Sequence, residues 1–237
     1  MPTIAELRAA TQPASIFERN SGEHWAGKLY MRRLSPYLTR LLLRTPITAN
    51  GVTWLMIACG VAAAAVLSLP GLAAAVGAAL LIQLQLLLDC SDGEVARWRG
   101  VKSTAGVYLD RIGHWLTEGA LPIALGVRAD GGWGELGTYT MLGLVVSVLV
   151  LLIKGESALV TVARAEAGLP PARDTVAVAA PRASGLRRLR RAAGFAPFFR
   201  AFVAVEATRV LVVALVVITA VTAVGHLLAI LTSERLR

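Results

Sequence analysis

The sequence predicts an all-α protein, a polytopic bundle of membrane-spanning helices, and three observations favour this class. Of its 237 residues, 56% are hydrophobic and only 16% are charged, whereas soluble domains carry about 25% charged residues. Apolar runs recur at the length of about 20 residues that a helix needs to cross the hydrocarbon core. The net charge of +9 comes from basic residues beside these runs, which is typical of contact with anionic lipid rather than with nucleic acid.

Residues 1–45 are expected to form a cytoplasmic arm that ends in an interfacial amphipathic helix. The beginning of this arm is polar and lacks the apolar core of a signal peptide. The rest mixes aromatic and aliphatic side chains with arginines, as in Tyr30, Arg32 and Arg33. A helix or helix pair of this composition lies in the headgroup region with its basic side toward phosphates. A solvated polar arm is the alternative interpretation.

Residues 46–237 are predicted to be the transmembrane domain. Its first four spans are expected at about 51–69, 71–90, 104–127 and 136–155. The short loop at 130–134 has one nearby arginine, Arg128, whereas residues 164–200 contain eight. Because positive charge accumulates in cytoplasmic loops, we expect this loop to be external and the arginine-rich stretch to be cytoplasmic. The connection after the second span, residues 89–102, then also faces the cytoplasm.

The last apolar run, Phe198–Leu231, is too short for two ordinary spans and long for one. Glu206 and Arg209 also lie within it. A short or broken helix before the last span would explain this pattern, and so would a segment missing from the chain near Ala207. The sequence leaves both explanations open.

The first polar group that indicates chemistry lies at the cytoplasmic end of the second span. Carboxylates are costly at membrane depth, so ionisable residues within or beside a span are functional candidates. Asp89, Asp92 and Ala96 are spaced i, i+3 and i+7 and share one face of a helix. Arg97 can neutralise a phosphate oxygen. Gly93 leaves room for a nucleotide to approach the backbone.

A second polar group lies on the third span. Gly106, Asp110 and His114 are spaced i, i+4 and i+8, so they also share one face. Together the two faces offer ligands suited to Mg²⁺ or Mn²⁺, which prefer carboxylates and bind substrate phosphates. Two such ions about 3.5–4 Å apart would stabilise both the attacking and the leaving oxygen of an in-line displacement. The pattern therefore predicts a metal site for a phosphorylated substrate.

Seven positions of this region resemble the signature of the CDP-alcohol phosphotransferase (CDP-alcohol phosphatidyltransferase) family. They read Asp89-x-x-Asp92-Gly93-x-x-Ala96-Arg97, then eight residues, then Gly106-x-x-x-Asp110. The resemblance implies an integral membrane enzyme with about six transmembrane helices and an active site that faces the cytoplasm. Such an enzyme moves a phospho-alcohol from a CDP-alcohol donor to an acceptor hydroxyl and releases CMP.

The resemblance also implies roles for individual residues. The motif aspartates Asp89, Asp92 and Asp110 would hold the divalent metal. The segment TPITANGVT resembles a short Pro-Asn and Thr element of the family, although Ala49 stands where proline is usual. The substrate-binding residues implied in this way are Asn50, Thr53, Gly93, Ala96, Arg97, Ser103 and Gly106.

One position departs from the family pattern. The family has a fourth aspartate four residues after the third, as a metal ligand and the proposed base for the acceptor hydroxyl, and this chain has His114 there. A neutral imidazole, with an ordinary pKa of about 6.5, can do both jobs. His114 and Asp110 are therefore the expected catalytic residues and also expected metal ligands. The loss of one negative charge favours weaker Mg²⁺ binding or a softer divalent ion.

The resemblance leaves the substrates open. CDP-diacylglycerol with a polar alcohol would yield a phospholipid, and a CDP-polyol is the other class of donor. A non-catalytic lipid- or nucleotide-binding relative that lost the fourth aspartate is an alternative. A membrane prenyltransferase is disfavoured, because no second Asp-rich motif is visible and aromatic residues make up only 6%. The resemblance also implies a homodimer, and the Arg- and Ala-rich, Lys-poor composition favours a bacterial source.

Overall fold

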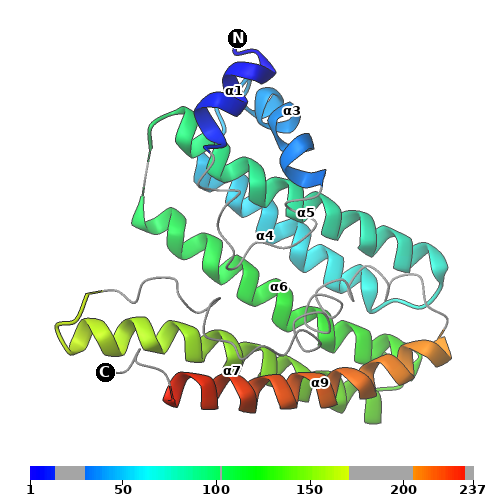
Figure 1. The fold of residues 1–237 in the computed structure, drawn as a ribbon. Helices are drawn as coiled ribbons and strands as arrows, with labels where there is room; N and C mark the ends of the chain where they lie inside the picture. The colour runs from blue at the N-terminus through cyan, green and yellow to red at the C-terminus, as the bar shows by residue number, and fades with distance from the viewer. Residues whose placement is uncertain (14–29, 102, 171–204, 233–237) are drawn as a thin grey trace. The chain divides into compact units, whose positions relative to one another are not determined.

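The computed structural model describes residues 1–13, 30–101, 103–170 and 205–232 (Figure 1). Every regular element in these ranges is a helix, which confirms the all-α class. In chain order the helices are α1 (Ile4–Thr11), α3 (Arg32–Leu42), α4 (Ala49–Leu67), α5 (Leu72–Trp98), α6 (Thr104–Asp130), α7 (Thr138–Glu166) and α9 (Val205–Leu231).

Four of these helices are long and apolar enough to cross a membrane, namely α4, α5, α7 and the part of α9 at Thr208–Leu231. They support the predicted membrane class, whereas the count of about six spans stays a prediction. Helix α6 matches the predicted span at 104–127 and equals α5 in length, at 27 residues each. It is not among the four, because charged residues interrupt its apolar sequence.

Helix α5 continues to Trp98, beyond the predicted end of its span at 90, so the first half of the motif lies on the helix itself. The helix ends where Gly100 adopts a φ of 65°, a conformation that glycine reaches without steric cost. The amide of Gly100 donates to the Arg97 carbonyl, and the amide of Val101 donates to the Ala96 carbonyl. This is the Schellman arrangement. It turns the chain sharply between the two halves of the motif.

The structure divides into two compact units. Unit 1 comprises residues 1–63 and 76–117 and holds α1, α3 and the whole motif. Unit 2 comprises residues 64–75 and 118–237 and holds the turn between α4 and α5, the second half of α6, α7 and α9.

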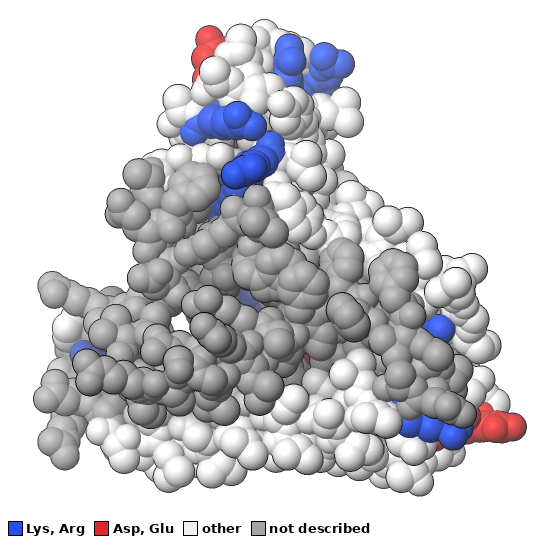
Figure 2. Space-filling view, turned by 45° about the vertical axis from the view of Figure 1, so that its right-hand side comes forward, with Lys and Arg blue, Asp and Glu red and all other residues white. Residues whose placement is uncertain are grey.

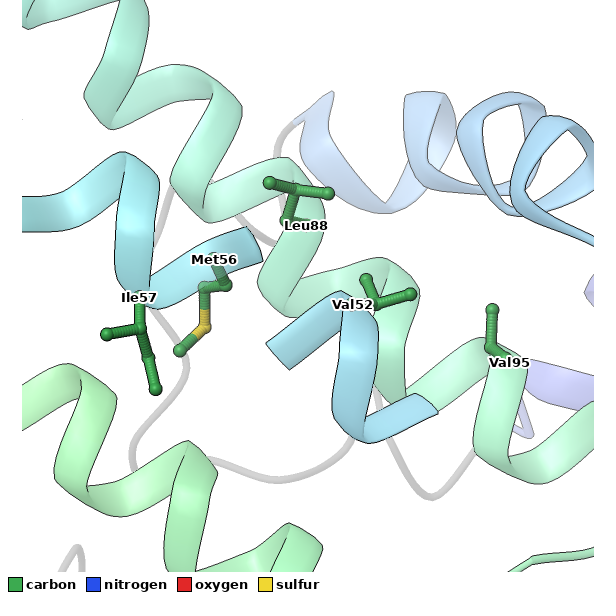
Figure 3. Packing of buried hydrophobic residues seen from close by; sticks show 5 residues of the cluster. All are labelled: Val52, Met56, Ile57, Leu88 and Val95. Carbon is green, nitrogen blue, oxygen red and sulfur yellow. The ribbon is translucent and has the colours of Figure 1, made fainter. Parts of the chain in front are cut away.

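The core of unit 1 lies between α4 and α5 (Figure 3). Val52, Met56 and Ile57 of α4 pack with Leu88 and Val95 of α5, and three of the five have no exposed surface. Leu38 and Leu42 of α3, together with Leu43 directly after it, cover the edge of this cluster. In a bilayer such contacts stabilise helix pairs by close packing, because lipid tails are as apolar as the side chains. The cluster therefore sets α5 against α4 beside the motif.

Helix α3 buries part of its polar side and exposes its apolar side. Ser35 and Thr39 are fully buried, whereas Leu34, Tyr37 and Leu41 are 49%, 59% and 56% exposed. This is the arrangement expected of an interfacial helix whose apolar side lies in the headgroup region. Figure 2 shows basic side chains at the same end of unit 1, where α1 and α3 lie. The middle of the predicted N-terminal arm lies outside the described residues.

In unit 2, α9 lies alongside α7 (Figure 1). Leu125 and Ala129 of α6 pack with Val146 of α7 and with Val212 and Leu215 of α9. The described part of the C-terminal apolar run is therefore one continuous helix. The residues before α9, and most of the predicted arginine-rich cytoplasmic stretch, lie outside the described residues.

Arg209, Glu156 and His226 lie within apolar helices of unit 2, and each has a partner there. The Nε atom of Arg209 donates to the carbonyl of Ala129 at 3.1 Å, and its guanidinium lies 5.4 Å from the centre of the Tyr139 ring. His226 Nδ1 lies 2.8 Å from Glu156 Oε2, which links α9 to α7. These contacts explain how α9 accommodates Arg209 and His226, which would be costly in lipid without partners.

Candidate metal and nucleotide site

Three of the four predicted metal ligands meet between α5 and α6 in unit 1. The ligand atoms of Asp89, Asp110 and His114 all lie within 4.8 Å of one another. His114 Nε2 lies 2.9 Å from Asp89 Oδ1 and 3.5 Å from Asp110 Oδ1. Their side chains are 30%, 44% and 29% exposed, so a solvated ion could reach them. Two carboxylates and an imidazole are a donor set that fits a divalent cation.

Helix α6, which carries Asp110 and His114, packs closely on α4, and this contact fixes the position of α6 along α4. A Cβ atom at Gly113 would stand 2.6 Å from Ile57 Cγ1, and one at Gly60 would stand 2.0 Å from Thr117 Oγ1. Nearer the start of α6, a Cβ atom at Gly106 would stand 2.8 Å from Asn50 Oδ1. The paired residue numbers rise together, so the two helices run parallel. Glycine at these points lets their backbones approach closely.

Asp92, the fourth predicted ligand, is not part of this group of three. It is only 9% exposed, and its Oδ2 accepts a hydrogen bond of 2.7 Å from the Thr53 hydroxyl. Its Oδ1 accepts from the amide of Gly93 at 2.5 Å. Thr53, predicted to line the nucleotide pocket, therefore also holds a motif aspartate in place. Neutral donors of this kind offset the cost of burying a carboxylate.

The guanidinium of Arg97 packs against Gly93, one turn earlier on the same helix, α5, which carries the first half of the motif. A Cβ atom at position 93 would stand 3.0 Å from Arg97 Nη1 and 3.2 Å from Nη2, so the guanidinium occupies the space beside this glycine. The Nε atom of Arg97 donates to the carbonyl of Thr11 at 2.6 Å. The arginine remains exposed overall, and Ala96 beside it is partly exposed. The predicted room for a nucleotide at Gly93 is thus filled by a side chain suited to phosphate.

The remaining predicted binding residues meet at the start of α6. The Ser103 hydroxyl accepts a hydrogen bond of 2.9 Å from the amide of Gly106 and so caps the helix. Asn50 Oδ1 lies beside Gly106. The structure therefore brings Asn50, Ser103 and Gly106 together at a helix N-terminus, where backbone N–H groups favour anions.

Glu94 is a residue of the motif segment that the sequence interpretation missed. Its side chain has no exposed surface, and hydroxyl groups of Ser35 and Thr39 donate to it. A third carboxylate, between Gly93 and Val95, in a helix that already carries Asp89 and Asp92 is a signal that sequence reasoning could have used. Arg99 was missed as well; it donates to carbonyls of the α3–α4 connection.

Comparison with known proteins bears on the identity of this site. No curated protein matches the chain. The sequence profile of the family described as CDP-alcohol phosphatidyltransferase matches residues 46–180, which is more than half of the 237 residues and includes the whole motif. The chain belongs to the CDP-alcohol phosphatidyltransferase family of membrane phosphotransferases.

Proposed function

We propose that this protein is an integral membrane transferase that moves a phospho-alcohol from a CDP-alcohol to an acceptor hydroxyl and releases CMP. The observation that carries the proposal is the meeting of Asp89, Asp110 and His114 in a chain of this family, whose helix α5 also carries a phosphate-suited arginine, Arg97. The donor is CDP-diacylglycerol or a CDP-polyol, and the product is a phospholipid or a related phosphodiester. The residues described here act at the cytoplasmic side of the membrane.

In the proposed reaction the acceptor oxygen attacks the β-phosphorus of the donor. A bond forms between these two atoms, and the bond from the β-phosphorus to the bridging oxygen breaks, so that CMP leaves with the electron pair. Asp89, Asp110 and His114 would hold Mg²⁺ or Mn²⁺, with Asp92 completing a second ion site, and the metal would offset the charge of the diphosphate. Arg97 would neutralise phosphate oxygens of the leaving group.

The acceptor proton must pass to a base, and two residues compete for this role. His114 Nε2 is the atom that faces both Asp89 and Asp110. One nitrogen cannot bind a metal ion and accept a proton at the same time. If Nε2 binds metal, a carboxylate oxygen of Asp110 takes the proton; if Nε2 is free, His114 is the base.

The first experiment is a measurement of CMP release by purified protein in nanodiscs. CDP-diacylglycerol, CDP-inositol, CDP-glycerol and CDP-ribitol would be offered with pooled acceptors in Mg²⁺ and in Mn²⁺, and Asp110→Asn would serve as the control. We expect release with one donor, a requirement for the metal, and loss of activity in the control.

The same experiment addresses a second candidate function, which His114 favours. A relative that lost the fourth motif aspartate could bind nucleotide without turnover. Stabilisation of the protein by CMP or CDP against thermal unfolding, together with no release from any donor, would support that non-catalytic role over the transferase.

A further inference from the structure

We propose that Glu94 is a positioning residue, through which the N-terminal arm of α1 and α3 orients Arg97 toward the donor diphosphate. The role of Arg97 rests on the function proposed above. The link between the arm and the motif helix rests on contacts within unit 1 alone.

Glu94 is the buried anchor of this link. It has no exposed surface, and its Oε1 accepts from Gln12 Nε2 at 2.8 Å and from Ser35 Oγ at 2.5 Å. Its Oε2 accepts from Thr39 Oγ1 at 2.7 Å. A buried carboxylate is costly unless its oxygens are hydrogen-bonded, and such networks hold one geometry once they are satisfied. Both helices of the arm are thereby attached to one residue of the motif segment.

The end of α1 touches the motif helix at a second point, one turn further along. The carbonyl of Thr11 accepts the Nε–H of Arg97 at 2.6 Å, while the next residue, Gln12, donates to Glu94. Gln12 also donates to the carbonyl of Arg32, at the start of α3. Glu94 and Arg97 are spaced i and i+3, so they lie on neighbouring positions of one helix face. Two contacts one turn apart hold α1 in a single register on α5.

This register determines which nitrogens of Arg97 can donate hydrogen bonds to a ligand. The Thr11 carbonyl accepts the hydrogen bond of Nε–H, and Nη1 and Nη2 lie against Gly93. Among the described residues, Nη1 and Nη2 have no hydrogen-bond partner, so they can donate to two phosphate oxygens. Such two-point binding is the geometry in which arginine binds phosphate best. Without the contact to Thr11, the Arg97 side chain could rotate. The entropy lost when the donor then orders it would weaken donor binding.

Matched variants separate positioning from plain stability. Gln12→Ala removes one donor to Glu94. Arg8→Ala removes a hydrogen bond between α1 and the Arg33 carbonyl that does not involve α5, so it is the control for damage to the arm. Thr39→Val removes the hydroxyl with little change of shape, and Thr39→Ser restores it.

We expect the KM for the CDP-alcohol donor to rise about tenfold in Gln12→Ala and Thr39→Val, with the acceptor KM unchanged and kcat reduced less. Arg8→Ala and Thr39→Ser should keep a donor KM within about twofold of that of the original protein. An unchanged donor KM in folded Gln12→Ala and Thr39→Val would overturn the proposal. A merely structural role would lower the unfolding temperature of Gln12→Ala and Thr39→Val without a selective change in donor KM.

A second readout distinguishes failure of this inference from failure of the proposed function. If the original protein turns over no CDP-alcohol, the proposed function fails, and amide hydrogen exchange over residues 94–101 still tests the link. Faster exchange there in Gln12→Ala than in Arg8→Ala supports it, and equal exchange overturns it. Protection against thermal unfolding by inorganic diphosphate, reduced in Gln12→Ala, would show that the link acts on anion binding.

Discussion

At the residue scale, the central feature is His114, which stands where the resemblance described above implies a fourth aspartate. His114 Nε2 lies 2.9 Å from Asp89 Oδ1, so the imidazole bridges the two helices that carry the ligands. A cation bound here would replace this contact with metal–ligand bonds. Exchange of an imidazole for a carboxylate changes the charge of the site by one, which alters affinity for a hard ion such as Mg²⁺ more than affinity for a softer one.

We predict that His114→Asp lowers the Mg²⁺ concentration for half-maximal CMP release by about tenfold. His114→Ala should lower kcat by about 10²-fold or more, as expected on loss of a base or ligand. Titration of CMP release with Mg²⁺ and with Mn²⁺ checks both. His114→Ala with undiminished kcat would assign the histidine a purely structural role.

A second residue, Asp130, caps a helix of unit 2. Burial opposes its ionisation, but hydrogen bonds from the hydroxyl and amide of Thr140 and from the amides of Gly137 and Tyr139 outweigh burial and hold the pKa of this carboxyl below its ordinary value. These amides belong to the start of α7, where unpaired N–H groups need acceptors. Asp130 thus caps α7 from across the loop.

The sign of the pH dependence follows from this lowered pKa. The folded state favours the ionised carboxylate, so its stabilising effect is fully present above the unfolded pKa of about 4 and is lost as pH falls through the folded pKa. We predict that Asp130→Asn unfolds at a lower temperature than the original protein at pH 6, and that this difference shrinks toward pH 3. Unfolding temperatures in detergent measure it, and a difference independent of pH would contradict the capping role.

At the element scale, the parallel contact between α4 and α6 determines where the second ligand pair lies. Gly113 occupies the position between Asp110 and His114 on the side that meets Met56 and Ile57 of α4. A larger residue there must displace flexible side chains or the helix itself. Movement of α6 by even 1 Å would separate ligand atoms that now lie within 4.8 Å, and catalysis is sensitive to errors of that size.

We predict that Gly113→Val reduces CMP release about tenfold or more, because the valine pushes α6 away from α4. Gly155→Ala in α7 is the control for adding a side chain to a helical glycine, since a Cβ atom there meets open space, and it should retain activity. The measurement is kcat for CMP release in protein that elutes as a single folded species. Full activity in Gly113→Val would show that α6 does not depend on this contact.

At the scale of the whole molecule, the distribution of charge determines the expected orientation in the membrane. Basic side chains gather around α1 and α3 (Figure 2), whereas the loop between α6 and α7 contains glycines and Trp133. Trp133 Nε1 donates to Ser68 Oγ at 2.7 Å, which ties this loop to the turn between α4 and α5. By the positive-inside rule, such asymmetry predicts that the arm is cytoplasmic and the loop external.

Cysteine labelling of intact cells tests this orientation. We predict that Gly134→Cys reacts with a membrane-impermeant maleimide added outside, because a side chain at position 134 meets open space. Arg8→Cys should react only after the membrane is permeabilised. The original protein, which contains Cys59 and Cys90, gives the background. Labelling of Arg8→Cys in intact cells would reverse the topology.

The sequence by itself determined the all-α membrane class, the family, and the identity of most residues at the site. Each of these depends on information that is local in the chain. Hydrophobic run length predicts a span, and the i, i+3, i+4 period predicts which residues share a face, so Asp89 with Asp92 and Asp110 with His114 could be grouped without coordinates. The apolar pattern predicts a span that ends near residue 90, whereas α5 as a helix continues to Trp98, because the polar motif residues extend it.

Only the tertiary structure decided which faces meet. Thr53 bonds Asp92 across 39 positions of the chain, and Gln12 bonds Glu94 across 82. Helical periodicity places each of these residues on a face but does not encode the partner helix or its axial register. That register comes from close packing at glycines such as Gly113 and from buried hydrogen bonds, whose energies depend on atoms brought together only when the whole unit folds.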